Sequence, residues 1–253
     1  MAGPGQDEDF IGALPLPIER RLPDGSDPWR CTPQLGRLLA RLVLAGRRTV
    51  LEFGAGASSC ILAAALAFSG GGTLVSLEQD PAWCEMEWAD VEGQAGVKSH
   101  LLHLRVQPRH FRPAKLSTDL AALQSHRFDL VLVDAPQYWF GRDATLPFAA
   151  PYLAPTALVV LDDAGRAGEQ RAIRGWLLRY PNLSVRLSDP DYGGRGVAVL
   201  RWQPGERFSL RARVLEAYAA LKRGHREGHL AFLRDSTPGR CLNGLRQRPS
   251  LNL

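Results

Sequence analysis

Hydrophobic positions along the chain follow two periods, one typical of helices and one typical of buried strands. A first amphipathic helix is indicated by apolar residues at helical spacing, namely Leu35, Leu38, Leu39 and Leu42, and Gly46 ends it. Short apolar runs predict strands over Thr49–Phe53, Thr73–Leu77, Ser99–Val106, Phe128–Val133, Ala157–Leu161, Leu183–Leu187 and Val197–Trp202. Helical segments separate most of these strands, over Ser58–Phe68, a stretch opened by Pro81, Asp143–Leu153 and Gly165–Tyr180.

Strands and helices that alternate at this length predict a single α/β domain with a doubly wound, seven-stranded, mostly parallel sheet. The last two strands are an exception. About nine residues join Leu187 to Val197 and contain no helix, which is too short for a usual parallel crossover. We therefore expect a final antiparallel strand pair at one edge of the sheet.

The pattern divides the chain into three parts. Residues 1–33 are rich in proline, glycine and aspartate and predict an N-terminal arm, residues 34–203 hold the sheet domain, and residues 204–253 predict a basic helical extension. The net charge is +5, yet residues 201–253 carry 11 Lys/Arg against 4 Asp/Glu. This tail leaves nucleic acid open as a disfavoured partner, because its aromatic residues do not interleave with its cations as a base-stacking surface requires.

Composition bears on the cellular compartment of the protein. No stretch of about 18 apolar residues exists, so the sequence predicts no membrane-spanning helix and no membrane partner. Acidic residues stand where a secretory signal would be basic and then apolar, at Asp7, Glu8 and Asp9. The four cysteines are scattered and form no CxxC pair, which disfavours a disulfide framework. We expect a cytoplasmic protein.

Polar side chains gather at the carboxyl ends of the predicted strands. They are Glu52 with Gly54, Ala55, Gly56, Ser58 and Ser59 at the first strand, Glu78 at the second, Gln107 at the third, Asp134 at the fourth, and Asp162 with Asp163 at the fifth. Ligands of open parallel sheets bind outside these strand ends. A purely structural sheet does not need acids at these ends, so we expect one binding site along this edge.

The glycine loop favours a particular kind of cofactor. Gly54 and Gly56 allow a tight turn and let a ligand approach the next helix, but Ser59 replaces the third glycine of a dinucleotide fingerprint. Glu52 would repel an anionic pyrophosphate, which disfavours an NAD-dependent oxidoreductase. A cationic cofactor without phosphates fits better, and Glu78, 24 residues after Gly54, can bind both hydroxyls of its ribose.

Three segments of the sequence resemble the class I S-adenosylmethionine-dependent methyltransferases. They are residues 51–58 (LEFGAGAS), 75–78 (VSLE) and 128–134 (FDLVLVD). The resemblance spans about residues 34–202 and implies a Rossmann-like fold with S-adenosylmethionine (SAM) as cofactor. It places Gly54, Ala55, Gly56 and Ser58 at the methionine end, Glu78 at the ribose and Gln107 near the adenine, and Glu52, Ser59 and Asp134 complete the predicted cofactor site.

Three acids at the fourth and fifth strand ends predict a bound cation. Asp134 should meet Asp162 and Asp163 at adjacent strand ends, and without a fixed basic partner the three carboxylates repel one another. Oxygen ligands suit Mg²⁺ or Ca²⁺. The arrangement resembles the catechol-type metal-dependent O-methyltransferases, but Gln137 stands where that subfamily has a lysine base. A metal alone, another base, or a metal-free site in which Asp162 caps the next helix all stay open.

The sequence therefore predicts methyl transfer to the oxygen of a small hydroxylated metabolite, with magnesium as an open second cofactor. Asp134, Gln137 and Asp162 are the predicted catalytic residues. An asparagine-proline-proline-aromatic motif, which would point to a nitrogen acceptor, is absent, and the residues from Asp134 to Gln137 occupy its place.

Several alternatives to this prediction stay open. Residues 138–140 and Arg142 are candidates for an aromatic acceptor wall with one charge-selecting group, or for packing under the next helix. A non-catalytic SAM-binding or RNA-associated protein is the main alternative function, and an NAD-dependent oxidoreductase is less favoured. A homodimer is also open.

Overall fold

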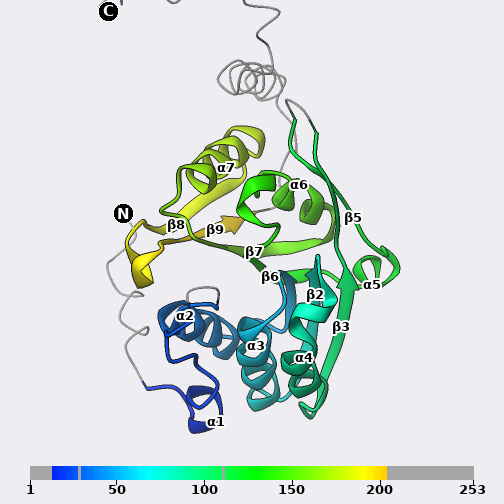
Figure 1. The fold of residues 1–253 in the computed structure, drawn as a ribbon, viewed down its shortest axis with the longest axis vertical. Coiled ribbons are helices and arrows are strands. Elements are labelled where there is room, and N and C mark those ends of the chain that lie inside the picture. Colours follow the sequence, from blue (N-terminus) through cyan, green and yellow to red (C-terminus); the bar gives the residue numbers. More distant parts are fainter. Residues whose placement is uncertain (1–12, 28–29, 110–111, 204–253) are drawn as a thin grey trace, which may run out of the picture.

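The computed structural model describes residues 13–27, 30–109 and 112–203, and a seven-stranded sheet forms its centre (Figure 1). Its strands are β1 (Thr49–Phe53), β2 (Gly72–Glu78), β3 (Val97–His103), β6 (Phe128–Val133), β7 (Leu153–Asp162), β8 (Leu183–Asp189) and β9 (Val197–Trp202). They lie in the order β3-β2-β1-β6-β7-β9-β8. Two short strands, β4 (Arg105–Gln107) and β5 (Lys115–Ser117), form a separate antiparallel ribbon.

Helices cover both faces of this sheet. The α-helices are α1 (Leu16–Glu19), α2 (Pro33–Leu44), α3 (Ala57–Phe68), α4 (Glu85–Glu92), α5 (Ala121–Gln124), α6 (Thr145–Ala149) and α7 (Ala167–Arg179). Short 3-10 helices are η2 (Pro81–Cys84), η3 (Tyr138–Phe140), η4 (Ala150–Tyr152) and η5 (Tyr192–Gly194). Figure 1 shows α2, α3 and α4 on one side of the sheet and α6 and α7 on the other.

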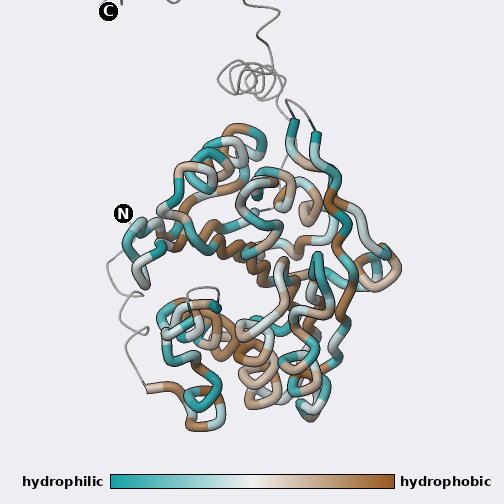
Figure 2. The backbone as a smooth tube through the Cα atoms, in the orientation of Figure 1, coloured by the Kyte–Doolittle hydropathy of each residue, from teal (hydrophilic) through white to brown (hydrophobic). Residues whose placement is uncertain are grey.

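The central strands are buried on both faces, which explains why their sequences are nearly continuous apolar runs. In β1, Leu51 and Phe53 pack in one core cluster together with residues of α6 and α7. Val50 packs in the other cluster, with residues of α2 and α3. The apolar strands run through the middle of the domain in Figure 2. Because side chains alternate along a strand, Glu52 is directed to the same face as Val50, towards α3.

The pairing of the strands confirms the predicted doubly wound sheet. β1 pairs in parallel with β2 and β6, and β6 pairs in parallel with β7, so the carboxyl ends of these strands meet at one edge. β9 is antiparallel to both β7 and β8, as the short connection after Leu187 predicted. The fold class expected from the sequence is therefore confirmed.

The first amphipathic helix is also confirmed, as α2. Thr32 caps it, since its hydroxyl accepts a hydrogen bond from the Leu35 backbone N–H at 3.1 Å, and Pro33 occupies its first turn. The apolar side chains of α2 are buried against α3. Part of the preceding arm packs on the same core, because Ile18 and Cys31 are buried there.

Two predicted segments ended too late in the chain. The third strand ends at His103, not Val106, because its partner β2 ends at the paired residue Glu78 and the chain then turns into β4. Gln107 therefore lies in the β4–β5 ribbon and not at a strand end of the main sheet. The helix predicted up to Leu153 is also shorter, because Pro151 lacks the N–H that would continue it.

In the part of the chain that the structure describes, no helix is both long enough and apolar enough to cross a membrane. The predicted basic extension, residues 204–253, lies outside the described residues.

Candidate active site

A glycine loop connects β1 to α3 at the carboxyl edge of the sheet. Gly54 has a φ of +96°, a left-handed conformation that favours glycine. A Cβ atom on Gly54 would lie 3.2 Å from the Cβ of Ala135, so the loops after β1 and β6 are in close contact. A Cβ on Gly56 would meet no atom within 4 Å. The loop thus leaves open space at Gly56, where a ligand can approach the first turn of α3.

Glu52 lies beneath this loop and has no exposed surface. Its carboxylate accepts hydrogen bonds from three hydroxyl groups, those of Ser58 at 2.6 Å, Ser59 at 2.6 Å and Ser76 at 2.5 Å. The Ser59 hydroxyl also accepts a hydrogen bond from the Gly56 backbone N–H at 3.0 Å. These contacts connect β1, β2 and the first turn of α3, so they fix the glycine loop from below.

This placement differs from the one expected for Glu52, Ser58 and Ser59 as cofactor-contacting side chains. All three are buried, and their polar atoms are bonded to one another. Burial raises the pKa of Glu52 to about 7, although the three serine hydroxyls act in the opposite direction. Their role in the described structure is to hold the loop. For Glu52, the alternation of side chains along β1 is the sequence signal for that role.

Glu78 stands at the end of β2, beside the glycine loop. Its Oε2 accepts a hydrogen bond from the Ala55 backbone N–H at 2.9 Å, and its Oε1 accepts one from the Asp80 backbone N–H, also at 2.9 Å. Burial raises its pKa. The side chain is partly exposed, so it joins the loop while it still faces the edge where a ligand would lie. The sequence prediction brought Glu78 and the loop together, and the structure does the same.

The three predicted acids meet at the ends of β6 and β7. One carboxylate oxygen from each of Asp134, Asp162 and Asp163 lies within 4.8 Å of the others. Asp163 has a left-handed φ of +56°, which turns the chain sharply after β7. The first residue of α7 is Ala167 and its N-cap, Arg166, makes no side-chain capping bond, so the alternative in which Asp162 caps this helix is wrong.

A buried arginine lies among these acids, and the premise that they lack a fixed basic partner was wrong. The side chain of Arg142 is only 4% exposed. Its Nη2 lies 2.9 Å from Asp134 Oδ1 and 3.1 Å from Asp163 Oδ2. Arg142 also donates hydrogen bonds to the backbone carbonyls of Asp134, at 2.5 Å, and Asp162, at 2.8 Å. Arg142, considered as a charge-selecting group of an acceptor wall or as packing under the next helix, is therefore an internal counter-ion.

The acids differ in how far they reach the surface. The Asp134 side chain is 26% exposed, whereas that of Asp163 is 4% exposed and Asp162 is buried. Burial, together with the charges of Asp134 and Asp163, raises the pKa of Asp162 to about 7. Burial also raises the pKa of Asp134, while Arg142 lowers it. Asp134 is thus the member of the cluster that an acceptor can reach.

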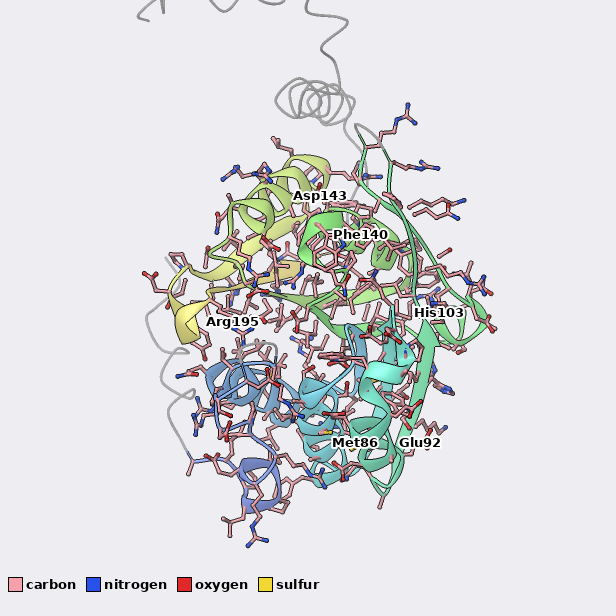
Figure 3. The ribbon with its side chains drawn as sticks, in the orientation of Figure 1. Met86, Glu92, His103, Phe140, Asp143 and Arg195 are labelled. Carbon is pink, nitrogen blue, oxygen red and sulfur yellow. The ribbon has the colours of Figure 1, made fainter. Side chains whose placement is uncertain are left out.

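Residues after β6 form the outer wall of this region. The Gln137 backbone N–H donates a hydrogen bond to Gln79 Oε1 at 2.9 Å, which joins the loops after β2 and β6, and the Gln137 residue is exposed. Trp139 is 60% exposed and its ring centroid lies 6.1 Å from that of Phe140. Phe140 lies on the α6 side of the sheet in Figure 3, and His103 marks the carboxyl end of β3.

Gln107 was expected near the adenine, but it does not lie with this group of residues. It is exposed in the β4–β5 ribbon, paired with Lys115, because the third strand of the sheet ends before it. Two other charges lie at the site without having been predicted there: Arg166, 2.8 Å from Asp163, and buried Glu169, whose Oε1 lies 3.9 Å from Arg142 Nε. In sequence, both resemble exposed charges at a helix start, so no signal distinguished them.

The fold and this site together define the class of protein. A doubly wound sheet that ends in an antiparallel pair carries a glycine loop after β1, an acid after β2 and a partly exposed acid after β6, all at one edge. This is the arrangement expected of a class I methyltransferase. Residues 51–164 match the family model described as a methyltransferase domain, which supports the predicted class I SAM-dependent methyltransferase family.

Solved structures with the same fold are distant in sequence. A putative O-methyltransferase from Klebsiella pneumoniae is 20% identical with a TM-score of 0.52, and the match covers 78% of this chain and 94% of that chain. The O-methyltransferase TomG from Streptomyces achromogenes, involved in tomaymycin synthesis and solved with SAM, is 20% identical with a TM-score of 0.50, over 78% of this chain and 93% of that chain. No curated protein sequence is significantly similar to this chain.

Filling the space at Gly56 is expected to block the cofactor without unfolding the domain. Gly56 has an extended backbone that any residue adopts, and a Cβ meets no atom there, so Gly56→Val should melt close to the wild-type temperature. We expect its SAM affinity, measured by calorimetric titration, to fall by at least about tenfold, or about 1.4 kcal/mol. Gly175→Val on α7, where a Cβ is equally free of contacts, is the matched control. Unchanged SAM affinity in Gly56→Val would place the cofactor elsewhere.

Proposed function

We propose that this methyltransferase transfers the methyl group of SAM to a hydroxyl oxygen of a small molecule. The observation that carries the proposal is the position of Asp134. Its carboxylate is partly exposed at the end of β6, and the next residue, Ala135, contacts the glycine loop at Gly54. A proton acceptor therefore lies beside the segment that would hold the methionine end of the cofactor. The two described O-methyltransferases of similar fold support oxygen as the acceptor atom.

Methyl transfer to oxygen requires that the acceptor is oriented towards the methyl group and that the proton of its hydroxyl is removed. Bound SAM supplies an electrophilic methyl group on its sulfonium. As the acceptor oxygen forms its bond to the methyl carbon, its proton passes to Asp134, and the electron pair of the broken carbon–sulfur bond stays on sulfur. Glu78 would hold the ribose hydroxyls, and the loop at Gly56 would fix the methionine end. The hydrogen bond from Gln137 to Gln79 keeps the two flanking loops in register.

The sequence also left open that magnesium assists the reaction. The acids that would bind the ion already have another partner. Asp134, Asp162 and Asp163 supply oxygen donors of the right kind. However, Arg142 already lies within hydrogen-bonding distance of carboxylate oxygens of Asp134 and Asp163. The residues present do not fit a divalent ion in addition to this guanidinium, and we assign no step of the reaction to a metal.

The proposal is tested by offering the full chain radiolabelled SAM and a panel of catechols, other phenols, sugars and RNA, with and without Mg²⁺. Transfer of label to a hydroxylated small molecule is the expected result. Binding of S-adenosylhomocysteine with no transfer to any acceptor would instead favour the non-catalytic alternative. Transfer of label to RNA would favour the RNA-associated alternative, provided that the RNA-binding constant falls steeply with salt and depends on residues 204–253. Preferential binding of NAD would contradict the cofactor.

A further inference from the structure

Arg142 occupies the centre of the cluster formed by Asp134, Asp162 and Asp163. Its Nη2 contacts one carboxylate oxygen of Asp134 and one of Asp163, at 2.9 and 3.1 Å. Its two terminal nitrogens also donate to the backbone carbonyls at the ends of β6 and β7, those of Asp134 and Asp162. One guanidinium therefore connects all three residues that would otherwise share a divalent ion.

This guanidinium is fixed in place by its surroundings. Its side chain is 4% exposed, and Glu169 Oε1 lies 3.9 Å from its Nε on the side of α7. The Arg142 backbone is held as well, because its carbonyl accepts a hydrogen bond from the Thr145 hydroxyl at 2.8 Å in the first turn of α6. An exposed arginine could swing away to admit an ion, but this one is surrounded by partners on several elements.

A divalent ion would have to take the same oxygens. Mg²⁺ binds carboxylate oxygens at about 2.0–2.1 Å, so an ion on Asp134 and Asp163 would lie next to the Arg142 nitrogens that contact them. Like charges at such short separation in a buried setting repel strongly. Two buried carboxylate oxygens have no hydrogen-bond partner among the described residues, Asp162 Oδ2 and Asp163 Oδ1, and these are the donors that an ion could still approach.

We propose that Arg142 takes the place of a divalent metal ion in this active site, so that a positive charge of the protein itself offsets the charge of the acids and methyl transfer is metal-independent. The proposal rests on the proposed function for its catalytic consequence but not for the placement of the cation. Arg142 acts as a positioning residue. It holds Asp134 Oδ1 from the buried side, while the exposed part of the Asp134 side chain faces the edge where an acceptor would bind.

The wild-type protein gives the first test. The full chain, saturated with S-adenosylhomocysteine, is titrated with Mn²⁺, and free Mn²⁺ is measured by electron paramagnetic resonance. We expect no stoichiometric Mn²⁺ site, and no change in melting temperature on addition of EDTA. One Mn²⁺ bound per chain, lost in Asp162→Asn, would overturn the proposal, because the acids would then hold an ion beside Arg142.

A charge-removing variant gives the second test. Arg142→Met leaves the acids without their internal cation, so we expect it to bind one Mn²⁺ per chain and to melt at a higher temperature with Mn²⁺ than with EDTA. Arg142→Lys retains a positive charge and should stay metal-free. Arg166→Met is the matched control, since Arg166 contacts Asp163 from a side chain that is 44% exposed. A folded Arg142→Met variant that binds no Mn²⁺ would also overturn the proposal.

These measurements separate this inference from the proposed function. Binding of Mn²⁺ and the shift in melting temperature need neither an acceptor nor turnover. If no methyl acceptor is found and Mn²⁺ behaves as expected, only the proposed function fails. If turnover occurs and the wild-type chain binds Mn²⁺ through Asp162, only the replacement of the metal by Arg142 fails. Should Arg142→Met not fold, the wild-type titration still decides the question.

Discussion

Replacing Asp134 with asparagine is expected to lower kcat by about 10²- to 10⁴-fold, the range typical of losing a general base. Asparagine keeps the size of the side chain and an oxygen for the contact with Arg142, which is 2.9 Å from Asp134 Oδ1 in the wild type. It cannot accept the proton of the acceptor hydroxyl. Because the loop at Gly56 and the acid Glu78 are untouched, SAM affinity should change little. Steady-state kinetics and calorimetric titration measure the two effects separately.

The same variant distinguishes a base from a structural acid. Asp119→Asn is the matched control and should retain wild-type turnover, because Asp119 is an exposed residue whose Oδ1 only accepts a hydrogen bond from the Ala121 backbone N–H. The wild-type rate should fall as the pH drops through the pKa of Asp134, which burial raises, since the protonated acid cannot act as base. Asp134→Asn should lose this acid limb. If it retains wild-type kcat, another group removes the proton.

The strands and the glycine loop could be predicted from the sequence because local patterns determine them. β1 and β6 lie within the predicted ranges because a strand buried on both faces must be apolar at nearly every position. Gly54 could be placed in the loop because glycine adopts a left-handed φ at low cost, whereas most other residues do not. The acids at the ends of β6 and β7 meet because parallel strands bring their carboxyl ends to one edge.

Other features of the site depend on contacts between distant segments. Arg142 precedes α6 and faces Asp163 across 21 residues, and nothing local in its sequence separates a buried counter-ion from an exposed charge. The end of β3 depends on where its partner β2 ends, so the position of Gln107 could not be read from its own residues. The direction of Glu52, in contrast, follows from the alternation of β1, and strand periodicity predicts it once β1 is known to be buried on both faces.

Neutralising Glu52 is expected to change how the stability of the domain depends on pH. Burial raises the folded-state pKa of Glu52 to about 7 from an ordinary value of 4.5. Between these values the folded state holds a proton that the unfolded state has lost, so the contribution of Glu52 to stability falls as the pH rises through this window and is constant above it. At about 1.4 kcal/mol per pKa unit, the loss is roughly 3 kcal/mol.

The comparison with Glu52→Gln isolates this effect from Asp162, whose pKa burial also raises to about 7. We expect the unfolding free energy of the wild type, minus that of Glu52→Gln, to fall by roughly 3 kcal/mol from pH 4.5 to pH 7, measured by urea denaturation. Ser76→Ala removes a hydroxyl that lowers the Glu52 pKa, so its stability should keep falling to higher pH. Parallel curves for the wild type and Glu52→Gln would mean that Glu52 is charged at pH 7 and that its three hydroxyl donors at least offset the effect of its burial.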